Sequence, residues 1–241
     1  FHREYGWDVD ELVTKKEQCA KFGVDMEMVA LPIHQLAVDG ESTPNYMRGF
    51  NDEADKEIEL ICHMIRQASE AEIPAIKYFL CEMENQRTDS HPPGRGNSRY
   101  STFRLEEAKN REQRYDQVLT AETNWERITY VLERIIPVAS EYKVRMACHP
   151  CDPFLPPGYK GVDRVLGGFD GFRHFIDICP SDYHGLNLCL GCMAESVKNP
   201  REEVPNILRY FGERKKIHLI HFRNIVGGQH RFQEVYPDEG D

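Results

Sequence analysis

The sequence has no excess of basic residues, and this absence disfavours two classes of partner. Its 30 lysines and arginines are outnumbered by 40 aspartates and glutamates, which gives a formal net charge of −10. Nucleic acids and anionic membrane surfaces attract proteins through basic patches, so we expect neither as a partner. A small anionic substrate stays compatible with this charge, because the local field of a site can oppose the charge of the whole chain.

Long apolar runs are also absent. No stretch reaches the roughly 20 apolar residues that a membrane-spanning helix needs, and no cleaved signal sequence is recognisable. Internal repeats and low-complexity linkers are missing too, which favours a single domain over residues 1–241. The chain starts at Phe1 rather than at a methionine and stops within a motif, so we expect it to belong to a longer sequence.

The eight cysteines do not indicate a disulfide framework. A chain of 241 residues can bury a core without covalent cross-links. Cys19 and Cys62 also fall on the apolar faces of expected helices, where free thiols are often buried. These features favour reduced thiols and a cytoplasmic location.

Apolar periodicity predicts alternating helices and strands. The expected helices cover residues 8–22, 54–71, 105–118, a segment that starts at 124, and stretches near 170–178 and 201–211. The expected strands cover residues 24–31, 75–81, 143–149, 185–189 and 216–222. This alternation favours an α/β fold with a parallel sheet, and five strands fit either a doubly wound sheet or part of a barrel.

Three consecutive expected strands end in residue types that bind metals. They place His149, Cys189 and His221 at their carboxyl ends. In parallel α/β folds these ends share one rim, where active sites form. Imidazole and thiolate bind borderline transition metals, and three protein ligands leave positions for water and substrate. We therefore expect a transition-metal site here rather than a Mg²⁺ or Ca²⁺ site, with ordinary core packing of each side chain as the alternative.

Two C-x-x-C pairs offer a competing interpretation as a structural zinc site. These pairs are Cys148 with Cys151 and Cys189 with Cys192. The first cysteine of each pair lies in an apolar strand, whereas zinc-binding pairs usually lie in tight turns, and this argues against the alternative. The three-ligand site predicts that Cys189→Ser abolishes metal binding and that Cys192→Ser largely spares it.

A Pro-, Gly- and Arg-rich loop over residues 88–101 contains candidate substrate-binding residues. Arg87, Arg95 and Arg99 lie in or next to it and can hold a carboxylate through two parallel hydrogen bonds, with a solvated basic loop as the alternative. Its glycines do not form a dinucleotide fingerprint, because they do not join a strand directly to a helix. The stretch 232–241 mixes acids with aromatic residues, which favours a site-forming loop over a solvated tail.

Several motifs together resemble the mannonate dehydratase family. They run in order over nearly the whole chain and include Cys148-His149-Pro150, the Cys189-x-Gly191 strand end, His221-Phe222-Arg223-Asn224 and Phe232-Gln233-Glu234. The resemblance implies an α/β fold, a (β/α)8 TIM barrel whose first two strands and last strand lie outside this sequence. It also implies Mn²⁺, or Fe²⁺ or Co²⁺, bound by His149, Cys189 and His221.

The activity implied by the resemblance is the dehydration of D-mannonate to 2-keto-3-deoxy-D-gluconate in glucuronate (hexuronate) catabolism. The metal would acidify the α-hydrogen of a small sugar-acid substrate, a base would remove it, and an acid would protonate the departing hydroxyl. Arg87, Arg95, Arg223 and Asn224 are the expected substrate-binding residues. A metal-dependent sugar isomerase or epimerase on the same barrel is the alternative, and we expect a homo-oligomer.

The chain departs from the family's pattern after the F-x-E motif. The family places an Asp-His pair two residues after this glutamate, where the chain has Tyr236 and Pro237. The expected catalytic residues are therefore Glu234, Tyr236 and Asp238, with the acids Glu234, Asp238 or Asp241 as replacements for the missing aspartate and Tyr236 for proton transfer.

Overall fold

The computed structural model describes residues 2, 4–32, 44–83, 85–88, 91–108 and 118–240. Its α-helices are α1 (Val9–Ala20), α3 (Asp52–Glu70), α4 (Leu105–Ala108), α5 (Ala121–Tyr142), α6 (Phe169–Asp177), α7 (Leu190–Ser196) and α8 (Pro200–Glu213), with single 3-10 turns at η1 (Asn45–Met47) and η2 (Arg95–Asn97). The strands are β1 (Val29–Ala30), β2 (Ala75–Tyr78), β3 (Thr102–Arg104), β4 (Arg145–Cys148), β5 (His184–Cys189), β6 (Ile217–His221), β7 (Asn224–Gly228) and β8 (Arg231–Val235). Most of the helix expected over residues 105–118 lies outside the described residues.

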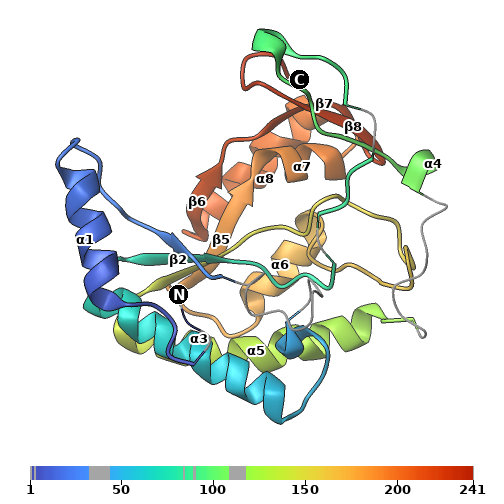
Figure 1. Cartoon of the computed structure of the whole chain (residues 1–241). Coiled ribbons are helices and arrows are strands. Elements are labelled where there is room, and N and C mark those ends of the chain that lie inside the picture. Colours follow the sequence, from blue (N-terminus) through green and yellow to red (C-terminus); the bar gives the residue numbers. More distant parts are fainter. Residues whose placement is uncertain are drawn as a thin grey trace.

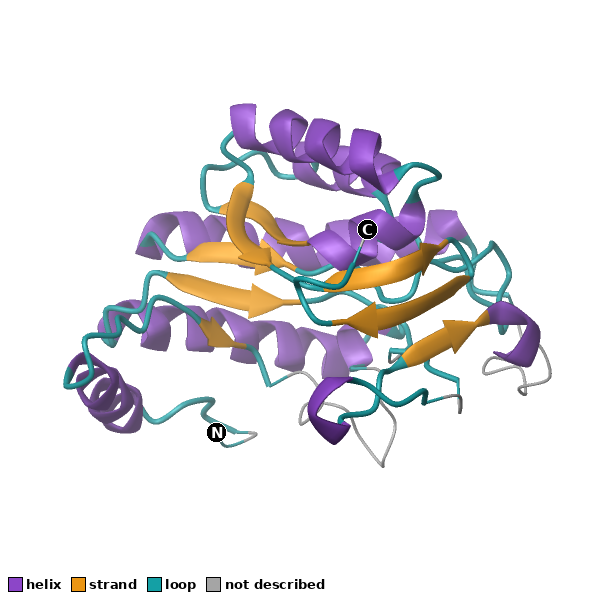
Figure 2. Cartoon of the chain, turned by 90° about the horizontal axis from the view of Figure 1, so that it is seen from above, coloured by secondary structure: helices purple, strands orange, loops and turns teal. Residues whose placement is uncertain are grey.

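Five strands form a parallel sheet in the order β1-β2-β4-β5-β6. The sheet curls as half of a barrel does, and the strands run in the same direction with helices between them (Figures 1 and 2). This arrangement confirms the expected α/β fold and its five parallel strands. All five strand carboxyl ends therefore lie along one rim, which is where functional side chains gather in such folds.

The long helices bury apolar faces against the sheet and against each other. In α3, Asn51 caps the first turn by accepting a hydrogen bond from the Ala54 N–H. Ile58, Ile61 and Ile65 lie on one side of this helix and are almost fully buried. Helices α3 and α5 lie side by side below the strands in Figure 1. Each buried side chain of this size contributes about 1.5–3 kcal/mol by leaving water.

Helix α5 begins earlier than the sequence pattern indicated. Its cap is Thr120, whose hydroxyl accepts from the Thr123 N–H, so the helix starts at Ala121 rather than at the expected residue 124. The helix ends at Lys143, which adopts a left-handed conformation with φ of 58° and donates its N–H to Ala139. The strand β4 follows directly, so the end of α5 sets where that strand begins.

A second sheet was not expected from the sequence. Strands β3, β8 and β7 form an antiparallel sheet in that order, with Phe103 paired to Phe232. It lies on the far side of the strands from α3 and α5, near the C-terminus in Figure 1. Phe103 and Phe232 belong to a second apolar cluster that also contains Ile225 and Leu155. The segment expected to be a loop over residues 232–241 therefore begins as a strand.

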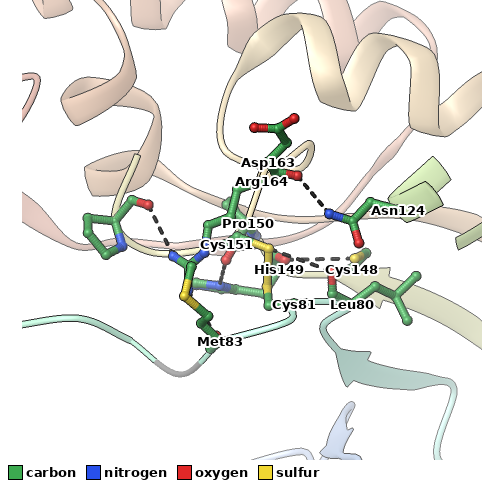
Figure 3. The surroundings of a disulfide bond; sticks show 11 residues. Leu80, Cys81, Met83, Asn124, Cys148, His149, Pro150, Cys151, Asp163 and Arg164 are labelled. Atoms are coloured by element: carbon green, nitrogen blue, oxygen red, sulfur yellow. Dashed lines mark hydrogen bonds between the residues drawn. A yellow bond between two sulfur atoms is a disulfide. The ribbon is translucent and has the colours of Figure 1, made fainter. Parts of the chain in front are cut away.

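One disulfide bond corrects the expectation that all cysteines are reduced. Cys81 and Cys151 are joined, with Cα atoms 5.6 Å apart (Figure 3). The cause is strand register: Tyr78 and Cys148 are paired in β2 and β4, so the residues three positions further along both strands meet. Within the described residues the other six cysteines are free. None of the described helices is both long and apolar enough to cross a membrane.

Candidate metal centre

Three metal-ligand side chains meet at the carboxyl ends of neighbouring strands. His149 follows β4, while Cys189 and His221 end β5 and β6 and are paired in register. The Nε2 atom of His149 lies 3.0 Å from Nδ1 of His221. Both imidazoles also hydrogen-bond to the Cys189 sulfur. The structure therefore brings together the three residues that the strand ends had indicated.

The orientation of His149 is fixed by its second ring nitrogen. Nδ1 lies 2.8 Å from the carbonyl oxygen of Pro150, which is the partner that a donating N–H requires. Because Nδ1 is held by this carbonyl, Nε2 is the ring nitrogen directed at the other two side chains. Histidines that bind metals are commonly held in this way by a backbone carbonyl. His149 and Cys189 are buried, whereas His221 is exposed to solvent.

The Cys189 thiol has its pKa lowered well below the usual value. The largest cause is a hydrogen bond with Cys192, followed by those with His149 and His221 and by the charge of Arg223. The neighbouring Cys192 shows the opposite effect, because complete burial and the hydrogen bond with Cys189 raise its pKa. A lowered pKa favours the thiolate of Cys189, and the thiolate is the form of cysteine that binds metals. One thiolate and two imidazoles fit a divalent transition metal, and this donor set does not fit Mg²⁺ or Ca²⁺.

A network of buried charged side chains lies beside these three residues. Asp152 accepts hydrogen bonds from Arg87 at 2.7 and 3.0 Å and from Arg223 at 2.7 Å. Arg223 also donates to Glu195 at 2.7 Å, and Arg87 donates to Glu234. Burial and the nearby Asp152 charge raise the pKa of Glu195 to about 8. The guanidinium groups of Arg87 and Arg223 are therefore held in place by hydrogen bonds to carboxylates that are largely shielded from water.

The structure places the expected substrate-binding residues in two settings. Arg87 and Arg223 belong to the buried network, and the side chain of Arg223 is only 9% exposed. Arg95 lies on the surface, where it forms two hydrogen bonds to Asp238. Asn224 donates to the carbonyl of Pro237 at 3.0 Å and accepts from the next backbone N–H, so its side chain holds the chain after β8.

Two of the expected catalytic residues line one surface pocket. Glu234 and Tyr236 border it together with Tyr100 and residues of the loop before β3. The guanidinium of Arg95 stacks on the ring of Tyr236 at 4.3 Å. Asp238, the third expected catalytic residue, is paired with Arg95 as described above. Asp241 lies outside the described residues.

Cys192 and Glu195 were not expected at this site. Both lie in α7, a short helix that starts immediately after Cys189 and that the sequence pattern did not reveal. The ligand atoms of His149, Cys189 and Cys192 lie within 4.8 Å of one another. The C-x-x-C spacing of Cys189 and Cys192 could have indicated that Cys192 lies near the metal centre. Together with the pair Cys148 and Cys151, however, it was interpreted as a possible structural zinc site. The disulfide occupies the sulfur of Cys151, so the four-cysteine zinc site is not formed.

The half-barrel and this cluster define the class of the protein: a TIM-barrel-type fold with side chains of metal-ligand types at the carboxyl ends of its strands. The family model for D-mannonate dehydratase (UxuA) matches residues 96–241, which is more than half of the chain. The chain belongs to this family.

Curated relatives agree with the family assignment. The mannonate dehydratase of Streptococcus pneumoniae (strain 70585) is 26% identical over 255 residues, which cover 95% of this chain and 66% of the relative. The mannonate dehydratase of Thermotoga neapolitana is 26% identical over 267 residues, covering 96% of this chain and 70% of the relative. The chain thus spans slightly less than two thirds of the length of the streptococcal relative.

Solved structures confirm the fold. The mannonate dehydratase from Streptococcus suis serotype 2 superposes with a TM-score of 0.81 at 24% identity, over 100% of this chain and 67% of that one. A xylose isomerase domain protein from Planctomyces limnophilus gives a TM-score of 0.57 at 12% identity, over 97% of this chain and 67% of that one. The half-barrel described above is therefore a TIM-barrel-like sheet.

Proposed function

We propose that the protein catalyses the metal-dependent dehydration of D-mannonate to 2-keto-3-deoxy-D-gluconate and water, a step of hexuronate catabolism. The observation that carries the proposal is the convergence of His149, Cys189 and His221 at one rim in a member of the D-mannonate dehydratase family. A cytoplasmic location is part of the proposal, and the six free thiols among the described residues favour it.

The proposed cofactor is a divalent transition metal, Mn²⁺, Fe²⁺ or Co²⁺, held by His149 Nε2, the Cys189 sulfur and His221 Nδ1. When bound, such an ion acts as a Lewis acid that stabilises negative charge developing on substrate oxygens. The protein's part is to hold the three ligands before the ion arrives. The hydrogen bond from His149 to Pro150 and the register pairing of Cys189 with His221 support this role.

Arg95 is the proposed partner of the substrate carboxylate. It is exposed, and both of its terminal nitrogens already hold the carboxylate of Asp238 at 2.8 and 2.9 Å. A sugar-acid carboxylate offers the same two oxygens, so it can replace Asp238 on the same guanidinium. Arg87 and Arg223 are instead held by Asp152. We propose that they do not contact the substrate and that their positive charge contributes to the electrostatic potential at the metal site.

Glu234 and Tyr236 are the proposed proton-transfer pair. They share one pocket, which is open to a substrate. Arg87 donates hydrogen bonds to Glu234 and so holds its carboxylate in place for the proposed role of general base. The Tyr236 hydroxyl is the proposed general acid that protonates the departing hydroxyl, and water then leaves with that proton.

The test is incubation of the metal-loaded protein with D-mannonate, with detection of a 2-keto-3-deoxy sugar acid. We expect product with Mn²⁺, Fe²⁺ or Co²⁺, and loss of both activity and metal in Cys189→Ser. The matched control is Cys62→Ser, which changes another buried thiol away from the site and should retain both. Unchanged D-mannonate together with isomerisation of a sugar would overturn the proposal and favour the isomerase or epimerase alternative.

A further inference from the structure

The position of Cys192 next to the three ligands has no explanation in the proposed function. Its sulfur is completely buried and hydrogen-bonds to the sulfur of Cys189. Helix α7 produces this proximity, because Cys189 occupies the position just before its first turn and Cys192 lies one turn further along. The ligand atoms of both cysteines and of His149 all lie within 4.8 Å of one another. Two sulfurs and the His149 imidazole therefore form one cluster, and His221 joins it through its contacts with His149 and Cys189.

The neighbouring carboxylates are already occupied by other partners. Both oxygens of Asp152 accept hydrogen bonds from Arg87, and one of them also accepts from Arg223. One oxygen of Glu195 accepts from Arg223, and the other accepts from the Phe154 N–H at 3.1 Å. Releasing either acid to a metal would leave a buried guanidinium or amide without its partner, at a cost of about 1–3 kcal/mol or more.

The acids that follow β8 are occupied as well. Asp238 is held by Arg95, and Glu239 accepts hydrogen bonds from the Tyr100 hydroxyl and the Tyr236 N–H. A metal that recruited one of these acids would have to displace a donor that the acid already holds. The Cys192 sulfur, by contrast, accepts a hydrogen bond from Arg223 at 3.4 Å and already hydrogen-bonds to the Cys189 sulfur.

We infer that Cys192 is the fourth protein ligand and that the site binds a thiophilic divalent ion through two thiolates and two imidazoles. The inference rests on the proposed metal site and names a further ligand in it. Two thiolates balance the charge of a divalent ion, and the N–H of Arg223 can still donate to a metal-bound sulfur. Gly191 permits this arrangement, because a Cβ at that position would come within 2.5 Å of the Nε atom of Arg223.

This ligand set changes the expected metal preference and the role of Cys192. Soft thiolates favour Zn²⁺, Co²⁺ and Fe²⁺ over Mn²⁺, whose preferred ligands are oxygens. The expectation that Cys192→Ser largely spares metal binding is replaced by its opposite. We expect this variant to lose more zinc affinity than the roughly 10–100-fold that loss of an outer-sphere partner costs.

The test is X-ray absorption spectroscopy of the zinc-loaded, fully reduced wild-type protein, which needs no variant to fold. Sulfur ligands lie about 2.3 Å from zinc and nitrogen ligands about 2.0–2.1 Å, so the two are counted separately. We expect two sulfurs and two imidazole nitrogens per zinc. In Cys192→Ser the sulfur count should fall to one, whereas Cys62→Ser should keep two.

The outcomes separate this inference from the proposed function. One sulfur per zinc in the wild type would overturn the role of Cys192 and leave the three-ligand site intact. No sulfur at all, or no bound metal, would overturn both. Co²⁺-loaded protein gives a second readout, because the sulfur-to-cobalt charge-transfer absorption should weaken by about half when one of two thiolates is removed.

Discussion

Arg223 illustrates how far a single residue can be interpreted from sequence. The resemblance implied that it binds substrate, and that role stays a prediction. In the structure its guanidinium bridges Asp152 and Glu195, two buried acids at 2.7 Å each. The sequence could not indicate these partners, because they come from a loop and a helix whose positions depend on the whole fold. By contrast, His149 and His221 were found because strand ends are readable from local apolar patterns.

His184 lies away from the histidines of the candidate metal centre. It lies at the opposite end of its strand, is completely buried and is 2.9 Å from the carbonyl of Phe175 through Nε2. Desolvation lowers its pKa from 6.5 to about 4. The pKa of His218 is lowered to about 4 as well, again mainly by burial. Both residues are therefore neutral in the folded protein at neutral pH.

These two histidines predict that the protein loses stability on mild acidification. Between pH 6.5 and about 4 the unfolded chain binds protons that the folded protein does not, so the free energy of unfolding falls as the pH falls. For His184 the loss amounts to about 3 kcal/mol across this window. The measurement is urea unfolding at a series of pH values between about 7.5 and about 4, in steps of about half a unit.

His184→Gln is the control for this prediction. Glutamine keeps an N–H donor for Phe175 but does not titrate, so the variant should show a shallower dependence of stability on pH. If the slope is the same in the variant and the wild type, His184 does not cause the effect.

At the level of elements, local signals predicted helices better than sheets. Helices α1 and α3 begin and end within about two residues of their expected bounds, because Asp8 and Asn51 cap them and one apolar face is continuous. The strand expected over residues 24–31 shrinks to Val29–Ala30. The antiparallel sheet was missed, since β3 pairs with a strand about 130 positions later in the chain and no local pattern records such pairing.

The antiparallel sheet should depend on its own apolar cluster. Phe103 is completely buried and packs on Phe232 with ring centroids 5.9 Å apart. Replacing it with alanine removes a large buried side chain and should lower the free energy of unfolding by about 3–5 kcal/mol. Phe22→Ala is the matched control: this phenylalanine is 86% exposed, and its loss should change stability by less than about 0.5 kcal/mol. Equal effects in denaturant unfolding would contradict the assigned packing.

At the scale of the whole molecule, the curled parallel sheet gathers residues that are far apart in the sequence. His149 and His221 are separated by 72 positions, yet their ring nitrogens are 3.0 Å apart. The same geometry joins Cys81 to Cys151 across 70 positions. The shared rim of the strand ends was predictable from the alternation of elements, whereas the strand order was not, because five strands fitted a doubly wound sheet as well as part of a barrel. The disulfide and the position of Cys192 beside Cys189 were not predictable, because they depend on strand register and on the short helix α7.

The most direct test of the account is anomalous X-ray diffraction at the zinc edge from crystals of the reduced, zinc-loaded protein. We expect one strong peak within about 2.0–2.3 Å of His149 Nε2, His221 Nδ1 and the Cys189 sulfur. A protein that binds zinc with its peak elsewhere, or crystals with no peak at this rim, would contradict the central claim that these three side chains hold one ion.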